Sequence, residues 1–326
     1  MALLVGSTVL LAATPAWAAP GYRHFVLGDT AAPAAAAHSG GLLLMGGGDR
    51  NIDAMKWFFA HAGQGHIVIL RASLGPEIGK EFYNDIGGIR SAETFVFKGR
   101  KAAYDPKVLE ALRRADGIFI AGGDQSRYVR YWRGTPVAEA LNAHVSAGKP
   151  LGGTSAGLAM LGEKLYGAMD GGSLTSDEAL ADPFGPANTI EGDFLHLASL
   201  KGVVTDTHFK ERDRLGRLFA FVAKAQDGRP ADAPPMLGLG VDESAAVAVE
   251  ADGTGRIYAT APDGGAWLVK GAELRLPREA GPLRVDRVQV IGIGANSVLH
   301  LPQGKVDSPE FVRSYAVREG KAAQVQ

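Results

Sequence analysis

Between residues 42 and 153, short apolar segments alternate with amphipathic segments, and this alternation constrains the fold more than any other feature. The apolar segments predict strands at Leu42–Met45, His66–Leu70, Thr94–Phe97, Gly117–Ala121 and Pro150–Gly153. The segments between them predict helices at Ile52–Ala62, Glu77–Asp85, Pro106–Arg114 and Tyr128–Ala147. Strands that alternate with helices over this length indicate an α/β fold with a doubly wound, mostly parallel sheet.

The second half of the chain has a different pattern. Val203–Thr205 predicts a strand that leads into a long helix, Lys210–Ala225. From Leu237 to Leu301 the pattern is typical of strands separated by glycine turns, with runs at Ala245–Val249, Arg256–Ala259, Ala266–Val269 and Arg287–Ile291. We expect additional C-terminal antiparallel strands that extend the same domain. The prediction is one domain over residues 41–326, with a β-rich extension from about residue 250.

The first residues resemble a secretory signal peptide. An apolar segment, Leu3–Ala13, precedes Ala16-Trp17-Ala18, which fits a cleavage site and would leave Ala19 as the new N-terminus. This predicts a signal peptide over 1–18, a flexible lead-in over 19–40, and a secreted or periplasmic protein. The alternative is a buried hydrophobic helix. The segment is too short to anchor the protein in a bilayer.

Composition narrows the classes of partner. The chain has 46% hydrophobic residues, enough for a substantial core, and 34 basic against 35 acidic residues, for a net charge of −1. This balance predicts no nucleic-acid partner and, after signal cleavage, no membrane partner. Cysteine is absent, which excludes disulfides and thiolate chemistry. The glycines Gly46–Gly48 match neither a dinucleotide nor a phosphate loop, and no metal-binding motif occurs, so we expect no cofactor and no metal.

Ser155 lies in Gly153-Thr154-Ser155-Ala156-Gly157, between a predicted strand and the apolar run Leu158–Leu161. A G-x-S-x-G sequence at a strand-to-helix turn raises the serine hydroxyl out of the sheet, as a nucleophile requires. The same turn directs the amide of Ala156 toward an oxyanion. The alternative is that Ser155 only caps the helix.

A nucleophilic serine needs a base and an acid that orients it. His208 is the best placed of the eight histidines, because it follows an apolar strand and should lie at the active edge of the sheet. Asp242 and Glu243 offer adjacent carboxylates, and the sequence does not choose between them because strand neighbours face opposite ways. The tandem Gly122-Gly123 ends another strand and could supply an oxyanion amide.

Basic residues follow His208. Lys210, Arg214 and Arg217 would share one face of the predicted helix, with Arg212 nearby. Such a face is a candidate site for substrate carboxylates, because arginine binds carboxylates with two hydrogen bonds. The alternative is a solvated face paired with neighbouring acids.

Four motifs in order resemble cyanophycinases of peptidase family S51, which also contains aspartyl dipeptidase (peptidase E). They are Gly-Gly-Asp-Gln at 122–125, Gly-Gly-Thr-Ser-Ala-Gly at 152–157, Asp-x-His-Phe-x-x-Arg-x-Arg-x-Gly-Arg-Leu at 206–218, and Val-Asp-Glu at 241–243. The resemblance runs from about Gly41 to Val249 and leaves the β-rich tail uncovered.

The resemblance implies a flavodoxin-like domain related to class I glutamine amidotransferases. It implies a triad of Ser155, His208 and Glu243, and oxyanion donors at Gly123 and Ala156. The implied substrate contacts are Gln125, Asp206, Arg212, Arg214 and Arg217.

The implied substrate is cyanophycin, a polyaspartate chain with arginine on its side-chain carboxylates, and the product is β-aspartyl-arginine. The arginines would meet free carboxylates, and Asp206 or Asp124 would meet a guanidinium. The family usually has glutamine at the position of Thr207, so this chain departs from the pattern beside the base.

Other functions remain open at this point. One is an aspartyl or isoaspartyl dipeptidase of the same family, and another is an α/β-hydrolase esterase that uses Ser155, Asp242 and His300. A third is a non-catalytic secreted binding protein. The expected partner is a peptide or polymer that contains Asp and Arg. A homodimer is one assembly that the sequence leaves open.

Overall fold

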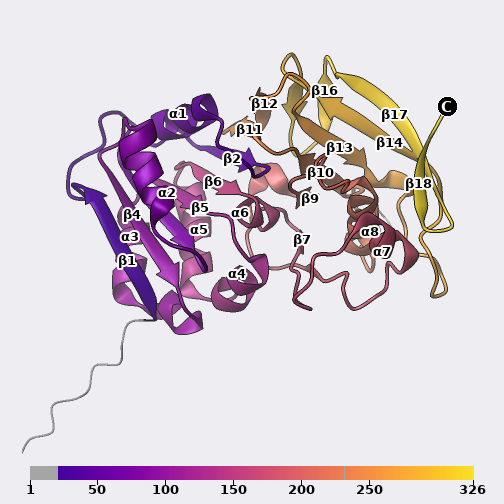
Figure 1. Ribbon diagram of the computed structural model, residues 1–326, viewed down its shortest axis with the longest axis horizontal. Helices are drawn as coiled ribbons and strands as arrows, with labels where there is room; N and C mark the ends of the chain where they lie inside the picture. The colour runs from indigo at the N-terminus through magenta and orange to yellow at the C-terminus, as the bar shows by residue number, and fades with distance from the viewer. Residues whose placement is uncertain (1–20, 231) are drawn as a thin grey trace, which may run out of the picture.

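The computed structural model describes residues 21–230 and 232–326, in which two large sheets lie side by side (Figure 1). The first sheet has ten strands. In spatial order they are β1 (Tyr22–Gly28), β4 (Ser91–Phe97), β3 (His66–Arg71), β5 (Gly117–Ile120), β6 (Leu151–Thr154), β2 (Gly41–Met45), β11 (Ala245–Glu250), β12 (Thr254–Ala259), β15 (Val298–His300) and β16 (Lys305–Asp307). The strands from β4 to β2 are parallel, and those beyond β2, like β1, pair antiparallel.

Helices cover both faces of the parallel strands, which confirms the predicted doubly wound α/β fold. They are α1 (Ile52–His61), α2 (Glu77–Lys80), a π-helical turn (Glu81–Ile86), a 3-10 turn (Arg100–Tyr104), α3 (Pro106–Arg114), α4 (Gln125–Trp132), α5 (Pro136–Ser146) and α6 (Ala156–Ala159). Successive side chains of β2 point to opposite faces, and all are buried because each face is covered. Leu43 packs on the side of α1, whereas Leu42 and Leu44 pack on the side of α4 and α5.

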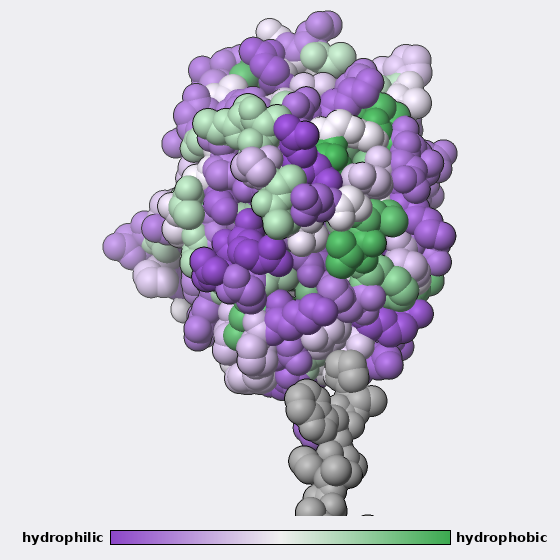
Figure 2. All heavy atoms as spheres, turned by 90° about the vertical axis from the view of Figure 1, so that its left-hand side faces the viewer, coloured by the Kyte–Doolittle hydropathy of each residue, from purple (hydrophilic) through white to green (hydrophobic). Residues whose placement is uncertain are grey.

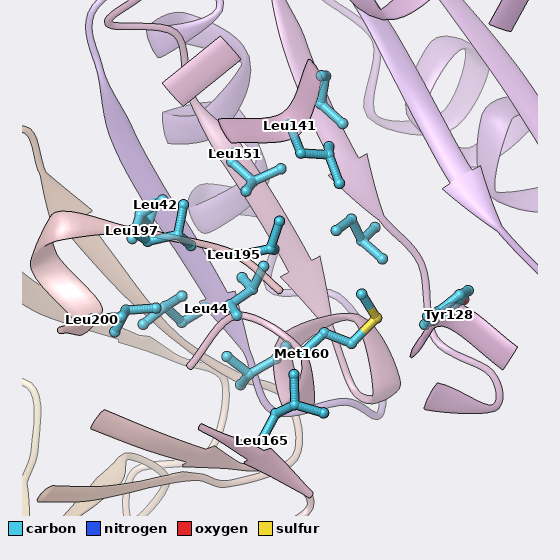
Figure 3. Close-up of a cluster of buried hydrophobic side chains, with 14 of the residues drawn as sticks. Leu42, Leu44, Tyr128, Leu141, Leu151, Met160, Leu165, Leu195, Leu197 and Leu200 are labelled. Atoms are coloured by element: carbon cyan, nitrogen blue, oxygen red, sulfur yellow. The ribbon is translucent and has the colours of Figure 1, made fainter. Parts of the chain in front are cut away.

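A close-up shows the second of these cores (Figure 3). Leu42 and Leu44 of β2, Leu151 of β6 and Leu141 of α5 all belong to this cluster. The cluster continues through Met160, Leu165, Leu195, Leu197 and Leu200. The residues that follow Ser155, Ala156 to Leu161, are thus anchored in this core.

The second sheet has six strands, in the order β18 (Lys321–Val325), β17 (Phe311–Arg318), β14 (Val285–Ile293), β13 (Ala266–Lys270), β10 (Leu237–Val241) and β9 (Val203–Asp206). Only the β9–β10 pair in it is parallel. The helices α7 (Ser176–Ala181) and α8 (Leu215–Gln226) lie beside this sheet (Figure 1). Smaller elements are β7 (Leu165–Tyr166), β8 (Ile190–Glu191) and 3-10 turns at Ala198–Leu200 and Gly271–Glu273.

The additional strands therefore divide between two sheets. The prediction of C-terminal antiparallel strands is confirmed, but only β11, β12, β15 and β16 extend the first sheet. The chain passes from one sheet to the other in the turn between β10 and β11. This turn places the end of β9 close to the ends of β2 and β6.

Three predicted boundaries are wrong. Part of the flexible lead-in forms β1, which pairs with β4 along its whole length. The predicted helix Tyr128–Ala147 is two helices, because Gly134 has a φ of 62° and Pro136 starts α5. The helix after His208 begins at Leu215, since Asp213 has a φ of 46°. The predicted signal peptide, 1–18, lies outside the described residues.

The face of the molecule at the β1 end of the first sheet is mainly hydrophilic (Figure 2). Hydrophobic side chains form small patches there, separated by polar ones. In residues 21–230 and 232–326, no helix combines the length and the hydrophobicity needed to cross a membrane.

Candidate active site

The ends of strands from both sheets meet at one place. Ser155 follows β6, and Gly122 and Gly123 follow β5, all in the first sheet. His208 follows β9 of the second sheet, and Glu243 lies in the turn that joins the two sheets. The prediction that His208 lies at the edge of the same sheet as Ser155 is therefore wrong, although the two side chains do meet.

The backbone at Ser155 is strained. Its φ is 51° and its ψ is −121°, a combination that residues with a side chain rarely adopt. A Cβ on Gly153 would lie 2.7 Å from the carbonyl oxygen of Gly157, and a Cβ on Gly157 would lie 2.1 Å from the oxygen of Ile120. Both glycines are required because the turn is packed this tightly, as the G-x-S-x-G sequence predicts.

Ser155 and His208 are hydrogen-bonded. The Oγ of Ser155 lies 2.7 Å from Nε2 of His208, and Nδ1 of His208 lies 2.5 Å from Oε1 of Glu243. A neutral imidazole that donates Nδ1–H to the carboxylate leaves Nε2 to accept the serine hydroxyl. Burial lowers the pKa of His208 below its ordinary 6.5, even though the bond to Glu243 opposes this shift. At neutral pH His208 is therefore an unprotonated base, oriented by an acid.

The structure distinguishes the two neighbouring carboxylates. Asp242 is buried, and its oxygens accept from the backbone amides of Lys210 and Gly265, both at 3.1 Å. Burial raises the pKa of Asp242 to about 6. Glu243 is the one that reaches His208, which agrees with the triad implied by the resemblance.

The esterase alternative is not assembled. His300 lies in β15 and its Nε2 is 2.7 Å from Oδ2 of Asp307, in the neighbouring strand β16. Asp242, the acid of that alternative, contacts Lys210, Gly265 and Trp267 rather than a histidine. The Ser155–Asp242–His300 arrangement is therefore wrong for this chain.

Gly47, which the sequence analysis left without a role, packs directly against the base. A Cβ on Gly47 would lie 2.2 Å from Cε1 of His208, and its φ is 115°. The backbone amide of His208 donates to the carbonyl of Gly46 at 2.8 Å, and that of Ser244 donates to Gly47 at 2.8 Å. The tandem glycines after β2 thus hold the imidazole and the corner that carries Glu243. In the sequence, these residues could have been noticed as three consecutive glycines after a strand that match no nucleotide-binding motif.

A cavity of about 320 Å³ opens at Ser155. Its wall includes Gly123 and Ala156, the two predicted oxyanion donors. A Cβ on Gly123 would lie 2.4 Å from Oγ of Ser73, so the loop at residue 73 supports Gly123 from behind. The remaining wall carries Asp124, Gln125, Ala168, Gly171–Ser173, Thr207, Arg212 and Arg214. Of these, the Gly171–Ser173 segment and Ala168 were not predicted.

The predicted substrate contacts divide into two groups. Gln125, Arg212 and Arg214 line the cavity. Asp206 and Arg217 do not: both are buried, and Nε of Arg217 donates to Oδ2 of Asp206 at 2.7 Å while Nη2 donates to Oδ1. The guanidinium that Asp206 meets is therefore the protein's own.

The predicted arginine face is also rearranged. The helix does not include Lys210, which pairs with Asp263 at the surface. Arg214 is buried and donates to the carbonyl oxygen of Thr207 at 2.7 Å and to its hydroxyl at 3.1 Å. Arg212 is half-exposed, and its Nη2 lies 3.8 Å from Oε1 of Glu243. Among the described residues, no three His, Asp or Glu side chains are grouped so that they could hold a metal ion.

The sequence of this chain is similar to those of known proteins. Residues 97–253 match the sequence model of peptidase family S51. The cyanophycinase of Synechococcus elongatus is 36% identical over 194 residues, which are 58% of this chain and 54% of that protein. The cyanophycinase of Trichormus variabilis is 30% identical over 222 residues, which are 65% of this chain and 68% of that protein.

The similarity to some relatives covers only part of their length. The alignment spans about half the length of the Synechococcus protein. A solved structure of a peptidase from an acI-B1 Actinobacterium superposes with a TM-score of 0.49 at 15% identity, over 88% of this chain and 97% of that one. The fold assignment rests on the strand order described above rather than on this superposition. The family match and the extent of the similarity to the Trichormus protein show that this chain belongs to peptidase family S51.

Proposed function

We propose that this protein is a serine-type peptidase in which Ser155 is the nucleophile. The observation that carries the proposal is the hydrogen-bonded row from Ser155 through His208 to Glu243, with a cavity at its serine end. A serine hydroxyl bonded to an imidazole that is itself bonded to a carboxylate supports nucleophilic catalysis rather than a capping role for Ser155.

In the proposed reaction, Oγ of Ser155 attacks the carbonyl carbon of the substrate while Nε2 of His208 takes the hydroxyl proton. The carbonyl oxygen becomes an oxyanion, which would accept from the amides of Gly123 and Ala156. His208 then gives its proton to the leaving amine, and the C–N bond breaks to leave an acyl-serine. Water, deprotonated by the same imidazole, releases the acid and restores Ser155. Glu243 stabilises the imidazolium throughout.

The proposed substrate is an aspartyl isopeptide chain of the cyanophycin type, and the proposed product is β-aspartyl-arginine. The names of the relatives support this substrate, and the wall of the cavity is compatible with it. Arg212 and Arg214 supply positive charge for carboxylates. Asp124, the N-cap of α4, supplies negative charge at the cavity wall, where its carboxylate also accepts from Ser126 and lies 3.4 Å from Nε of Arg127. With Asp206 occupied by Arg217, Asp124 is the member of the two predicted acids that faces the cavity.

One observation favours a second candidate, an aspartyl or isoaspartyl dipeptidase. Thr207 replaces the glutamine usual in cyanophycinases, and its hydroxyl accepts from Arg214 instead of offering an amide to a substrate. Loss of the amide removes one hydrogen-bonding group for the polymer beside the base.

The experiment has two parts. First, a fluorophosphonate should label Ser155 in the folded protein and not in Ser155→Ala; absence of labelling would favour a non-catalytic binding protein. Second, the protein is incubated with cyanophycin and with α- and β-aspartyl dipeptides. Release of β-aspartyl-arginine from the polymer supports the first substrate class, whereas turnover of dipeptides alone supports the second.

Secretion and assembly can be tested on the same protein. We propose that residues 1–18 are removed during export, so N-terminal sequencing of the mature protein should begin at Ala19. Light scattering of that protein tests the homodimer.

A further inference from the structure

A second cavity, of about 250 Å³, lies next to the catalytic one. Arg214 lines both cavities, which therefore adjoin each other at this residue. Its walls come from α7, the start of α8, β13, β17 and β18, which lie together at one side of the molecule (Figure 1). The strands among these follow residue 253, where the match to the family model ends.

The second cavity has an aromatic wall. Phe209, Trp267 and Tyr315 line it, and the rings of Phe209 and Trp267 are 5.8 Å apart between centroids. Trp267 and Tyr315 are partly exposed, so their rings are accessible. Aromatic faces attract cations and also cover the flat, weakly hydrated surface of a guanidinium.

Two carboxylates lie at the same cavity. Asp177 and Asp213 are exposed, and neither side chain makes a hydrogen bond or an ion pair with any other residue in 21–230 and 232–326. The two cations of the wall differ in this respect. Lys210 donates to Asp263, and Arg214 donates to Thr207 and lies 3.7 Å from Asp206. Asp177 and Asp213 are therefore the charged side chains of this wall that pair with no other group in the described part of the chain.

We propose that the second cavity binds a cationic side chain, a guanidinium or an ammonium group, of a substrate residue beside the bond that Ser155 attacks. This inference rests on the proposed peptidase function. Asp177 and Asp213 bind the charge, Trp267 and Tyr315 cover its apolar surface, and Arg214 lies between this group and the catalytic cavity. The cavity is a specificity site to which this chain's C-terminal sheet contributes Trp267 and Tyr315.

The test measures binding in Ser155→Ala, so that hydrolysis does not contribute. The probes are a peptide of two β-linked Asp-Arg units and the same peptide with citrulline, which is uncharged, in place of one arginine. By isothermal titration calorimetry, we expect the arginine peptide to bind about tenfold more tightly, as a paired cation stacked on aromatic rings would.

The test variant adds Asp177→Asn and Asp213→Asn to the inactive Ser155→Ala protein. We expect the preference for arginine to fall to about twofold or less when these charges are removed. The matched control is Asp193→Asn, whose side chain is 97% exposed and lies at a different cavity, and it should keep the preference.

Three results would overturn the inference: no binding of either peptide, an unchanged preference in the double variant, or loss of the preference in Asp124→Asn instead, which would place the cation in the catalytic cavity. Failure of the proposed function is seen separately, because it appears as absence of labelling at Ser155 in the wild-type protein.

Discussion

Replacement of Glu243 by glutamine tests the orientation of the base most directly. His208 gains a positive charge when it takes the proton of Ser155, and Glu243 lies 2.5 Å from the ring nitrogen that shares this charge. A hydrogen bond to a charged group contributes about 1.5–3 kcal/mol, or about 10- to 150-fold in rate. Glutamine can also donate to Nδ1 and so favour the wrong tautomer, a change that costs up to about 10⁴-fold in such a triad.

We therefore expect Glu243→Gln to slow labelling of Ser155 by a fluorophosphonate between about 10²- and 10⁴-fold. The labelling rate is a suitable assay because it needs no knowledge of the natural substrate. Circular dichroism should show the folded protein, since the Glu243 side chain is one-third exposed and its replacement has the same size.

The adjacent residue supplies the control. Asp242→Asn removes a carboxylate one position away that accepts from backbone amides and does not contact His208. We expect a loss of no more than a fewfold in its labelling rate. If Asp242→Asn reduced labelling by orders of magnitude while Glu243→Gln labelled normally, the assignment of the acid would be refuted.

Three further predictions concern the same region. Because burial lowers the pKa of His208, the acid limb of the labelling rate should lie below pH 6.5; Arg212→Gln should raise it, since the positive charge of Arg212 also disfavours the imidazolium. The pKa of Asp242 is raised from 3.8 to about 6, so between these pH values the carboxyl is protonated in the folded state and ionised in the unfolded state. Stability in urea should fall by about 3 kcal/mol at most between pH 4 and 6 and stay level above, and Asp242→Asn should lack this fall. Gly47→Ala should slow labelling by at least about 100-fold, because its Cβ would displace the imidazole; a normal rate would show that His208 can shift without cost.

The first sheet could be predicted from the sequence because its strands carry their own pattern. The β2, β3 and β5 segments are continuous apolar runs, as strands covered on both faces must be. The edge strand β1 could not be predicted in this way. Its side chains are mostly half-exposed or exposed, and its place depends on pairing with β4, far away in the sequence.

The site residues could be predicted better than the geometry that unites them. Ser155 is marked by its glycines, and His208 by its place at a strand end. Glu243 rather than Asp242 contacts His208 because of the conformation of a turn between two sheets. No local sequence pattern predicts which of the two neighbouring side chains faces His208. The sequence likewise suggests that Asp206 is free for a substrate, because it does not show that Arg217 comes back to bind it.

The division of the triad between two sheets has a mechanical consequence. Ser155 belongs to the first sheet and His208 to the second, so their 2.7 Å contact depends on how the sheets are joined. The joint is the Asp242–Ser244 turn, which is fixed on the first sheet by the bond from Ser244 to Gly47 and on the second by the bonds from Lys210 and Gly265 to Asp242. Glu243 lies between these two anchors. The acid that orients the base is thus carried by the turn that joins the sheet of the nucleophile to the sheet of the base.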